Sequence, residues 1–281
     1  MDIYADDTTL SLSSNWKTLP LLNQSLSQDQ SEVERWARQN KMYMNMPKNK
    51  ALLVTGKRLR KRMVQDTGKL EVKTDNAEIE QVANHKLLGM IMHEHLTYEV
   101  HVDKLCNKLS KRLGLLRHIS PCQRIIYFNA VIKPLMMYAS TVWTSCNKEV
   151  LERVIRMQKR AARIILESQC TSRTATLFNN LSWILFYNEA YIKRCELAFK
   201  RINGSQLSDY LSASLRKNSD VHSRNTRNRN VNLLCPLHKN ISELGRTFAV
   251  RTVKDWNNLP RSPKTRRSLK SFKAELWKIN I

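Results

Sequence analysis

Hydrophobic residues recur at helical spacing over residues 19–39, where the opposite face carries acids and glutamine. The apolar positions of this predicted helix are Leu22, Leu26, Val33, Trp36 and Ala37. The chain around it has short apolar runs that end at turn residues, which is typical of strands. We therefore predict a tight hairpin over residues 1–10 and further strands over residues 50–56, 70–72, 79–82 and 87–92.

Beyond residue 100 the helical period dominates. A predicted helix has apolar residues at helical spacing and cations opposite them. The apolar positions are Val102, Leu105, Cys106, Leu109, Leu113 and Leu116, and the cations are Lys104, Lys108, Lys111 and Arg112. Further helices are predicted over residues 122–143, with a kink at Pro134, and over residues 149–166, 188–203, 248–256 and 268–279. Residues 216–232 read as a loop. Short strands followed by many helices predict an α+β protein.

Charge is the unusual feature of the composition. The 281 residues carry a formal net charge of +24, so a polyanionic partner is expected and nucleic acid is the first candidate. Residues 1–50 are neutral, with six Lys or Arg against six acids. Residues 216–281 hold sixteen Lys or Arg against four acids. The basic surface is therefore expected late in the chain.

Cysteine spacing and hydropathy argue against a zinc-binding protein of the CxxC type and against a membrane-spanning protein. The six cysteines lie at least sixteen residues apart, so a zinc site of the usual CxxC spacing is not expected. Reduced thiols in a nuclear or cytoplasmic protein are predicted instead. The acidic start does not resemble a signal peptide, and the longest apolar stretch, residues 131–143, is too short to span a membrane.

Two adjacent carboxylates, Asp6 and Asp7, lie at the turn of the predicted hairpin. Like charges at a turn repel unless solvent or cations screen them. Carboxylates of this kind bind Mg²⁺ in two-metal phosphoryl-transfer sites. An ordinary solvated acidic turn is the alternative, and the pattern of residues leaves both interpretations open.

Four arginines recur on the predicted helix at residues 149–166. Arg153, Arg156, Arg160 and Arg163 are spaced 3, 4 and 3 residues apart and fall within an arc of roughly 80°. They face away from an apolar stripe formed by Leu151, Val154, Ile155, Ala161, Ala162 and Ile165. A bound polyanion would offset their mutual repulsion, because arginine binds phosphate through a planar fork. A solvated face is the alternative.

Two other clusters have open interpretations. Residues 57–62 hold five cations in six positions, which fits a nuclear-localisation or nucleic-acid patch, or a solvated loop. His85, His93, His95 and His101 include a His-x-His pattern that can ligate a metal. No carboxylate or cysteine partner is evident from the sequence, so structural or surface histidines are the favoured interpretation.

Several motifs resemble the reverse transcriptases of non-LTR, LINE-type (jockey-like) retrotransposons. Tyr4-Ala5-Asp6-Asp7 resembles their YxDD motif, and the stretch from His85 through Leu88-Gly89 to Leu96-Thr97 and His101-Val102 is similar to their primer-grip region. The remaining matches, in chain order, are a weaker match over Met44–Lys48, then Tyr138–Trp143, Met157–Arg163 and Trp256–Pro260. Together they extend over nearly the whole chain.

This resemblance implies RNA-templated DNA synthesis with Mg²⁺, acting on an RNA template, a DNA primer or an RNA–DNA hybrid. It implies that Asp6 and Asp7 are catalytic metal ligands, with Asp6 the more direct one, and that Leu88 and Gly89 are primer-grip-like. Residues 1–99 would be a partial polymerase palm, 100–167 a helical thumb and 168–281 a basic C-terminal region. The four arginines, together with Lys104, Lys108 and Lys111, would bind nucleic acid.

The same resemblance sets a limit on activity. The fingers and the palm strand with the third catalytic aspartate are not recognisable ahead of Met1, so we expect no polymerisation by this chain alone. A non-catalytic nucleic-acid-binding protein, resting on the thumb and the tail, is the alternative function. A membrane partner is not expected under either interpretation.

Overall fold

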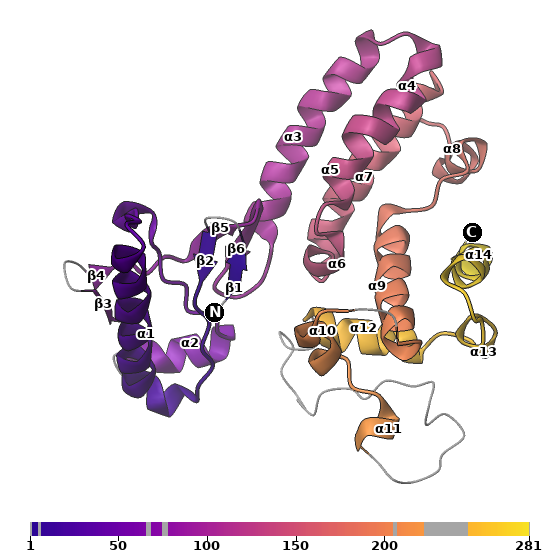
Figure 1. The fold of residues 1–281 in the computed structure, drawn as a ribbon. Coiled ribbons are helices and arrows are strands. Elements are labelled where there is room, and N and C mark those ends of the chain that lie inside the picture. Colours follow the sequence, from indigo (N-terminus) through magenta and orange to yellow (C-terminus); the bar gives the residue numbers. More distant parts are fainter. Residues whose placement is uncertain are drawn as a thin grey trace. The chain divides into compact units, whose positions relative to one another are not determined.

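A computed structural model describes residues 2–4, 7–65, 69–74, 78–204, 207–221 and 247–280 (Figure 1). The chain divides into two compact units, Met1–Leu96 and Thr97–Ile281. Helices predominate and the few strands are short and antiparallel, so the predicted α+β class is confirmed. No helix among these residues is both long and apolar enough to cross a bilayer. The finer division at residues 99 and 167 stays a prediction.

Three antiparallel strand pairs lie among the described residues of the first unit. They are β1 (Asp2–Tyr4) with β2 (Asp7–Thr9), β3 (Val72–Lys73) with β4 (Glu78–Ile79), and β5 (Asn84–Leu87) with β6 (Met90–His93). The hairpin predicted over residues 1–10 is therefore confirmed. A ferredoxin-like palm would join its strands in one sheet, whereas the described strands form separate pairs.

Helix α1 (Leu19–Gln39) has the bounds that the hydrophobic period predicts. It follows a short 3₁₀ turn (Trp16–Thr18), and a second one (Met46–Lys48) precedes α2 (Lys57–Gln65). Leu19 and Leu70 form the centre of a small core, against which Leu22, Leu26, Ala51, Leu53 and Leu59 pack. Trp36 was predicted to face inward, but it is 55% exposed, because the buried side of the later turns of α1 is formed by Gln30, Glu34 and Ala37 instead.

Two strand predictions in this unit are wrong. Residues 50–56 form no described strand; Ala51 makes one isolated parallel bridge to Gln81, and Thr55 N donates to Glu94 O at 2.9 Å. The segment touches its neighbours at separate points, so no continuous ladder forms. Residues 87–92 turn back on themselves, because Leu88 and Gly89 form the loop of the β5–β6 hairpin.

In the second unit, α3 (Glu99–His118) packs against α7 (Lys148–Ile165), and the two lie side by side in Figure 1. The predicted apolar face of α3 is buried at five of its six positions, whereas Cys106 is half-buried. On α7 the buried positions differ slightly from the prediction. Leu151 and Ile165 are only half-buried, whereas Val150 and Gln158 are buried.

The single kinked helix predicted over residues 122–143 is divided in the structure. It consists of α4 (Pro121–Tyr127), a π-helical turn (Phe128–Ile132), α5 (Lys133–Met137) and α6 (Ser140–Trp143). The π-helical turn lies directly before Pro134, which has no backbone N–H to donate. The larger break comes at Ala139, where φ is 49°.

The described part of this unit holds seven further helices. They are α8 (Thr174–Leu181), α9 (Phe186–Ile202), α10 (Asp209–Ser214), α11 (Asn218–Val221), α12 (Phe248–Asn257), α13 (Arg261–Lys264) and α14 (Leu269–Asn280). The helices predicted near α9, α12 and α14 are confirmed. Of the loop predicted over residues 216–232, residues 218–221 form α11, and the part after residue 221 lies outside the described residues.

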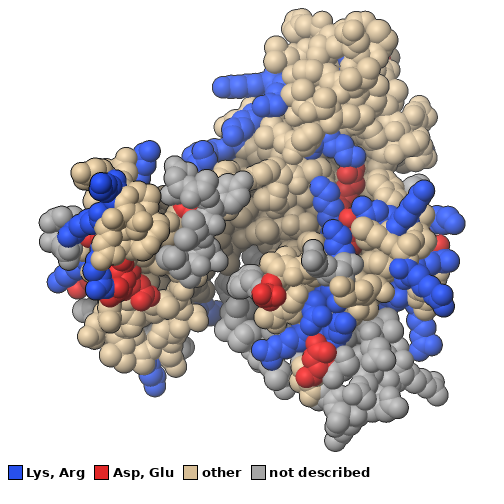
Figure 2. Space-filling model, viewed as in Figure 1, with Lys and Arg blue, Asp and Glu red and all other residues tan. Residues whose placement is uncertain are grey.

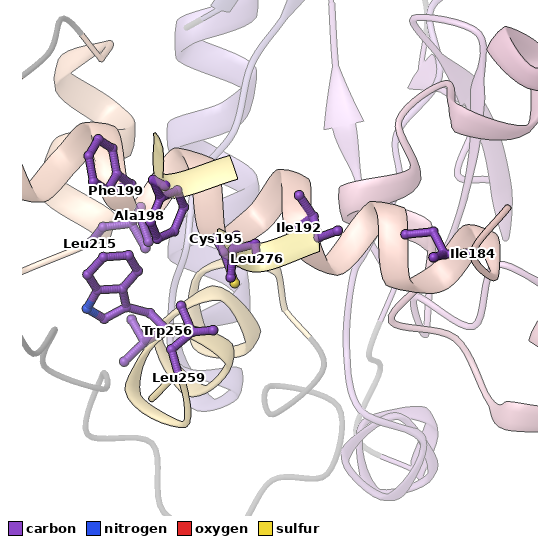
Figure 3. Packing of buried hydrophobic residues seen from close by; sticks show 11 residues of the cluster. Ile184, Ile192, Cys195, Ala198, Phe199, Leu215, Trp256, Leu259 and Leu276 are labelled. Carbon is purple, nitrogen blue, oxygen red and sulfur yellow. The ribbon is translucent and has the colours of Figure 1, made fainter. Parts of the chain in front are cut away.

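Figure 3 shows the apolar core that joins α9 to the C-terminal helices. Phe199 stacks on Phe272 with ring centroids 4.4 Å apart, and Trp256 is fully buried beside them. A buried polar group lies next to this core. The Arg194 side chain donates from Nε to Asp255 at 2.7 Å and from Nη1 to Thr144 Oγ1 at 3.0 Å, so it ties α9 to α12 and to the end of α6.

Candidate nucleic-acid interface

The aspartate pair is only partly within the described residues. Asp7 is the first residue of β2, pairs in register with Tyr4 of β1, and its side chain is exposed. Asp6 lies outside the described residues. The carboxylate of Asp7 is therefore exposed to solvent at the start of β2. The metal-site hypothesis requires such an accessible carboxylate.

Metal binding needs more than one carboxylate. Across the described ranges, no group of three or more His, Cys, Asp and Glu side chains is placed to hold a metal ion. Of the four histidines considered above, His95 bonds through Nδ1 to Thr55 O at 2.9 Å, and His93 Nδ1 accepts a hydrogen bond from the His95 amide at 3.0 Å. The described residues do not by themselves fit a Mg²⁺ site.

The primer-grip-like residues Leu88 and Gly89 occupy the two-residue loop between β5 and β6. Their φ values are 44° and 80°, so both are in the left-handed region that a tight type I′ hairpin loop requires. Glycine adopts this conformation without strain, whereas leucine does not. The Leu88 side chain is 44% exposed at the tip. The turn thus holds an apolar side chain outward on a fixed backbone.

The second unit brings part of the arginine row into a basic concavity. Val154, Ile155, Ala161 and Ala162 are buried on one side of α7, so the arginines must face outward on the other. Arg156, Arg160 and Arg163 line a groove of about 640 Å³ together with Arg117 from the end of α3. Its full lining is Arg117, Arg156, Lys159, Arg160, Arg163, Ile164, Glu167, Ser168 and Cys170, and we call it the α7 groove. Five of these side chains are cationic and one is acidic.

Arg153 does not belong to the groove. It forms an ion pair with Asp103 of α3, so one member of the predicted row is already neutralised by an acid that is fifty residues away in sequence. The charges of this ion pair also act on the thiol of Cys106, which lies on α3. Burial and Asp103 raise the pKa of its thiol, whereas Arg153 and Arg156 act in the opposite direction. Of the four predicted arginines, those that line the groove therefore begin at Arg156.

The guanidinium of Arg163 has unused bonding capacity. Its Nε is buried and finds no hydrogen-bond partner within the described part of the chain. A buried donor without a partner is unfavourable by about 1–3 kcal/mol, and a ligand oxygen that accepts from it would remove that penalty. Because arginine pairs with phosphate through parallel N–H groups, the groove suits a phosphate-bearing ligand better than a neutral one.

Arg124, on α4, holds the end of the groove in place. It donates to Ile119 O at 3.0 Å and to Ile164 O at 2.9 Å, and it forms an ion pair with Glu167 at 2.8 Å. The carbonyl of Ile164 is in the last turn of α7, where carbonyl groups lack helical partners. Arg124 therefore caps α7 from a neighbouring helix and also neutralises the only acid of the groove.

The three lysines predicted on α3 lie on a different surface. Lys104, Lys108 and Lys111 are exposed, and at 100° per residue they lie about 150° around α3 from Arg117. The groove lining does not include them. Lys108 acts instead on His101, whose pKa is lowered by burial and further by this lysine. The seven predicted nucleic-acid residues thus divide between a groove, an ion pair and a separate face.

Charge is spread widely over the molecule. Basic side chains cover more of the described surface in Figure 2 than acidic ones do, which agrees with the net charge of +24. Sequence reasoning missed Arg117, Arg124 and Lys159. The spacing of Lys159 to Arg156 and Arg163 was a usable signal. Arg117 and Arg124 contribute only through the packing of α3 and α4 against α7, which a linear pattern does not reveal.

Comparisons with protein-family models, with curated proteins and with solved structures found no match to this chain. The family resemblance therefore rests on the sequence motifs given above.

Proposed function

We propose that this chain is the palm-to-tail part of a non-LTR retrotransposon reverse transcriptase, and that it holds template–primer nucleic acid in the α7 groove. Residues 1–99 would act as palm, 100–167 as thumb and 168–281 as a basic C-terminal region, in the nucleus or the cytoplasm. The observation that carries the proposal is the gathering of five cationic side chains from α3 and α7 around one concavity.

The physical argument concerns the balance of charge. Cations packed on one helix face repel each other, and among the described residues Glu167 alone adds an acid to the groove lining. Its charge is already engaged by Arg124. Phosphates of a nucleic acid would neutralise the remaining cations and release condensed counterions, which is the main source of such affinity. Binding is therefore expected to depend strongly on salt and weakly on sequence.

The test measures binding of the full chain to a fluorescent RNA–DNA hybrid at several salt concentrations. The variant Arg156→Gln, Arg160→Gln, Arg163→Gln removes three groove cations. Each phosphate contact contributes about 0.7–0.9 to the slope of log affinity against log salt, so the slope should fall by about 2–3. An unchanged slope would refute the groove as the interface.

A matched control separates this effect from net charge. Lys193, Lys254 and Lys270 are exposed residues of the same unit outside the groove, and replacing all three with Gln removes the same charge. We expect this control variant to keep the wild-type slope. Replacing Lys104, Lys108 and Lys111 with Gln tests in the same assay whether the lysine face of α3 also contacts the ligand.

A non-catalytic binding protein is the second candidate, because the groove lies wholly in the second unit and needs neither Asp6 nor Asp7. The two candidates predict different results for a fusion protein that carries the fingers and first palm aspartate of a related element ahead of Met1. If the polymerase proposal is right, this fusion extends a primer on RNA with Mg²⁺, and Asp6→Asn abolishes extension while hybrid binding persists. A folded, binding-competent but inert fusion favours the second candidate.

A further inference from the structure

A second basic surface lies on α2 in the first unit. Residues 35–65 hold ten Lys or Arg and no Asp or Glu. Four of these cations pair with acids outside residues 35–65. Two pairs lie within α1, Arg35–Glu32 and Arg38–Glu34, and two join separate segments, Lys50–Glu80 and Arg60–Glu94. Lys57, Arg58 and Lys61 are exposed, and no hydrogen bond or ion pair joins them to another described residue.

The helical conformation places these three cations together. At 100° per residue, Lys57, Arg58 and Lys61 fall within an arc of about 100°, with Lys57 and Lys61 about one turn apart. Leu59 lies on the other side of α2 and packs against the Leu19–Leu70 core. Arg60 pairs with Glu94 at 3.6 Å and is largely buried. The core contact and the ion pair fix α2, so the three cations have a set orientation and do not form a solvated loop.

The same acid-free segment exposes two aromatic rings. Trp36 is 55% exposed at the end of α1, and Tyr43 is fully exposed after the chain turns back at Lys41, where φ is 56°. The Met42 amide donates to Ala37 O at 2.9 Å and fixes this turn. Proteins that bind unpaired strands combine exposed rings, on which bases stack, with cations that hold the phosphates, and this segment carries both kinds of side chain.

We propose that the α2 face formed by Lys57, Arg58 and Lys61 binds the phosphate backbone of single-stranded nucleic acid, whose bases stack on Trp36 and Tyr43. The proposal rests on the proposed function only in that the chain binds nucleic acid, and it adds a second surface in the other unit. An anionic membrane would also attract the three cations. Leu59 packs against the Leu19–Leu70 core, however, and is not available to enter a lipid layer.

The test compares full-length variants on a single-stranded RNA. Replacing Lys57, Arg58 and Lys61 with Gln should lower the slope of log affinity against log salt by about 2, since each single-strand contact contributes about 0.7. The ratio of wild-type to variant affinity should then rise roughly 15- to 20-fold when salt is lowered from 200 to 50 mM. Lys17, Lys69 and Lys73 are exposed in the same unit outside α2, and their triple Gln variant should keep the wild-type slope.

Further variants separate folding from binding. Exchanging Lys57 and Lys61 for Arg should preserve the slope, and circular dichroism should show the same helix content in every variant. Trp36→Ala and Tyr43→Ala should each lower single-strand affinity about 5-fold or more with little change in slope, because stacking is not ionic. Affinity that is unchanged in both aromatic variants would overturn the stacking part of the proposal.

Three results would overturn the proposal as a whole. The first is that the α2 variant has the same salt slope as the control variant. Another is an equal loss on a fully paired duplex, which would show that unpaired strands are not preferred. The third is unchanged RNA binding with lost binding to phosphatidylserine vesicles, which would identify a membrane partner. Measuring the α7 groove variant in parallel separates the two proposals, since its slope falls only if the proposed function holds.

Discussion

The buried Arg194–Asp255 pair allows a sharp test of what holds the second unit together. Arg194 is 2% exposed, and the Asp255 side chain is 17% exposed. Replacing Arg194 with Met keeps most of the apolar volume but leaves Asp255 largely buried without its partner. Breaking one side of a buried pair is unfavourable by about 3–5 kcal/mol. Arg251 lies near both residues and attracts Asp255, so we expect a value near the lower end, about 3 kcal/mol.

Thermal unfolding followed by circular dichroism measures this effect. For a unit of this size each kcal/mol lowers Tm by about 2–4 °C, so Arg194→Met should lower it by about 6–12 °C. The exposed neighbour Lys193 provides the control, and Lys193→Met should leave Tm within about 2 °C. The double variant Arg194→Met, Asp255→Leu should recover part of the loss, because no unpaired charge stays behind. A decrease of less than about 3 °C for Arg194→Met would refute the reasoning.

Three further predictions concern other parts of the molecule. Gly89→Ala should lower the stability of the first unit by about 1 kcal/mol in urea denaturation, because φ is 80° there; an unchanged midpoint would contradict this. Arg124→Gln should weaken hybrid binding a few-fold without changing the salt slope, since Arg124 braces α7; a lower slope would place it in the interface. Burial, helped by Asp255, raises the pKa of Cys195 from 9.0 to about 12, so the folded state keeps a proton that the unfolded state releases. The free energy of unfolding should therefore fall between pH 9 and 12 by up to about 1.4 kcal/mol per pH unit. An equally steep fall in the Cys195→Ala variant would refute this.

Local patterns determined most of the helices. The hydrophobic period gives the bounds of α1 and the buried face of α3, because packing on one side selects residues at helical spacing. The hairpin of β1 and β2 also follows from the sequence, since turn residues separate two short β-prone runs. The strand predicted over residues 50–56 was wrong, because an apolar run of that length pairs only where a partner strand is available.

The candidate interface depended on tertiary structure to a greater degree. The sequence placed four arginines on one side of α7, and three of them line the groove. Only the packing of α3 on α7 brings Asp103 to Arg153 and Arg117 to the groove. Gln158 shows the same dependence: it is polar yet buried, because its side chain bonds Ile184 O at 2.9 Å and the Phe186 amide at 3.0 Å at the start of α9. A sequence period reports which side of a helix is apolar, whereas the partners of its polar side chains come from segments far away in the chain, and only the fold brings those segments together.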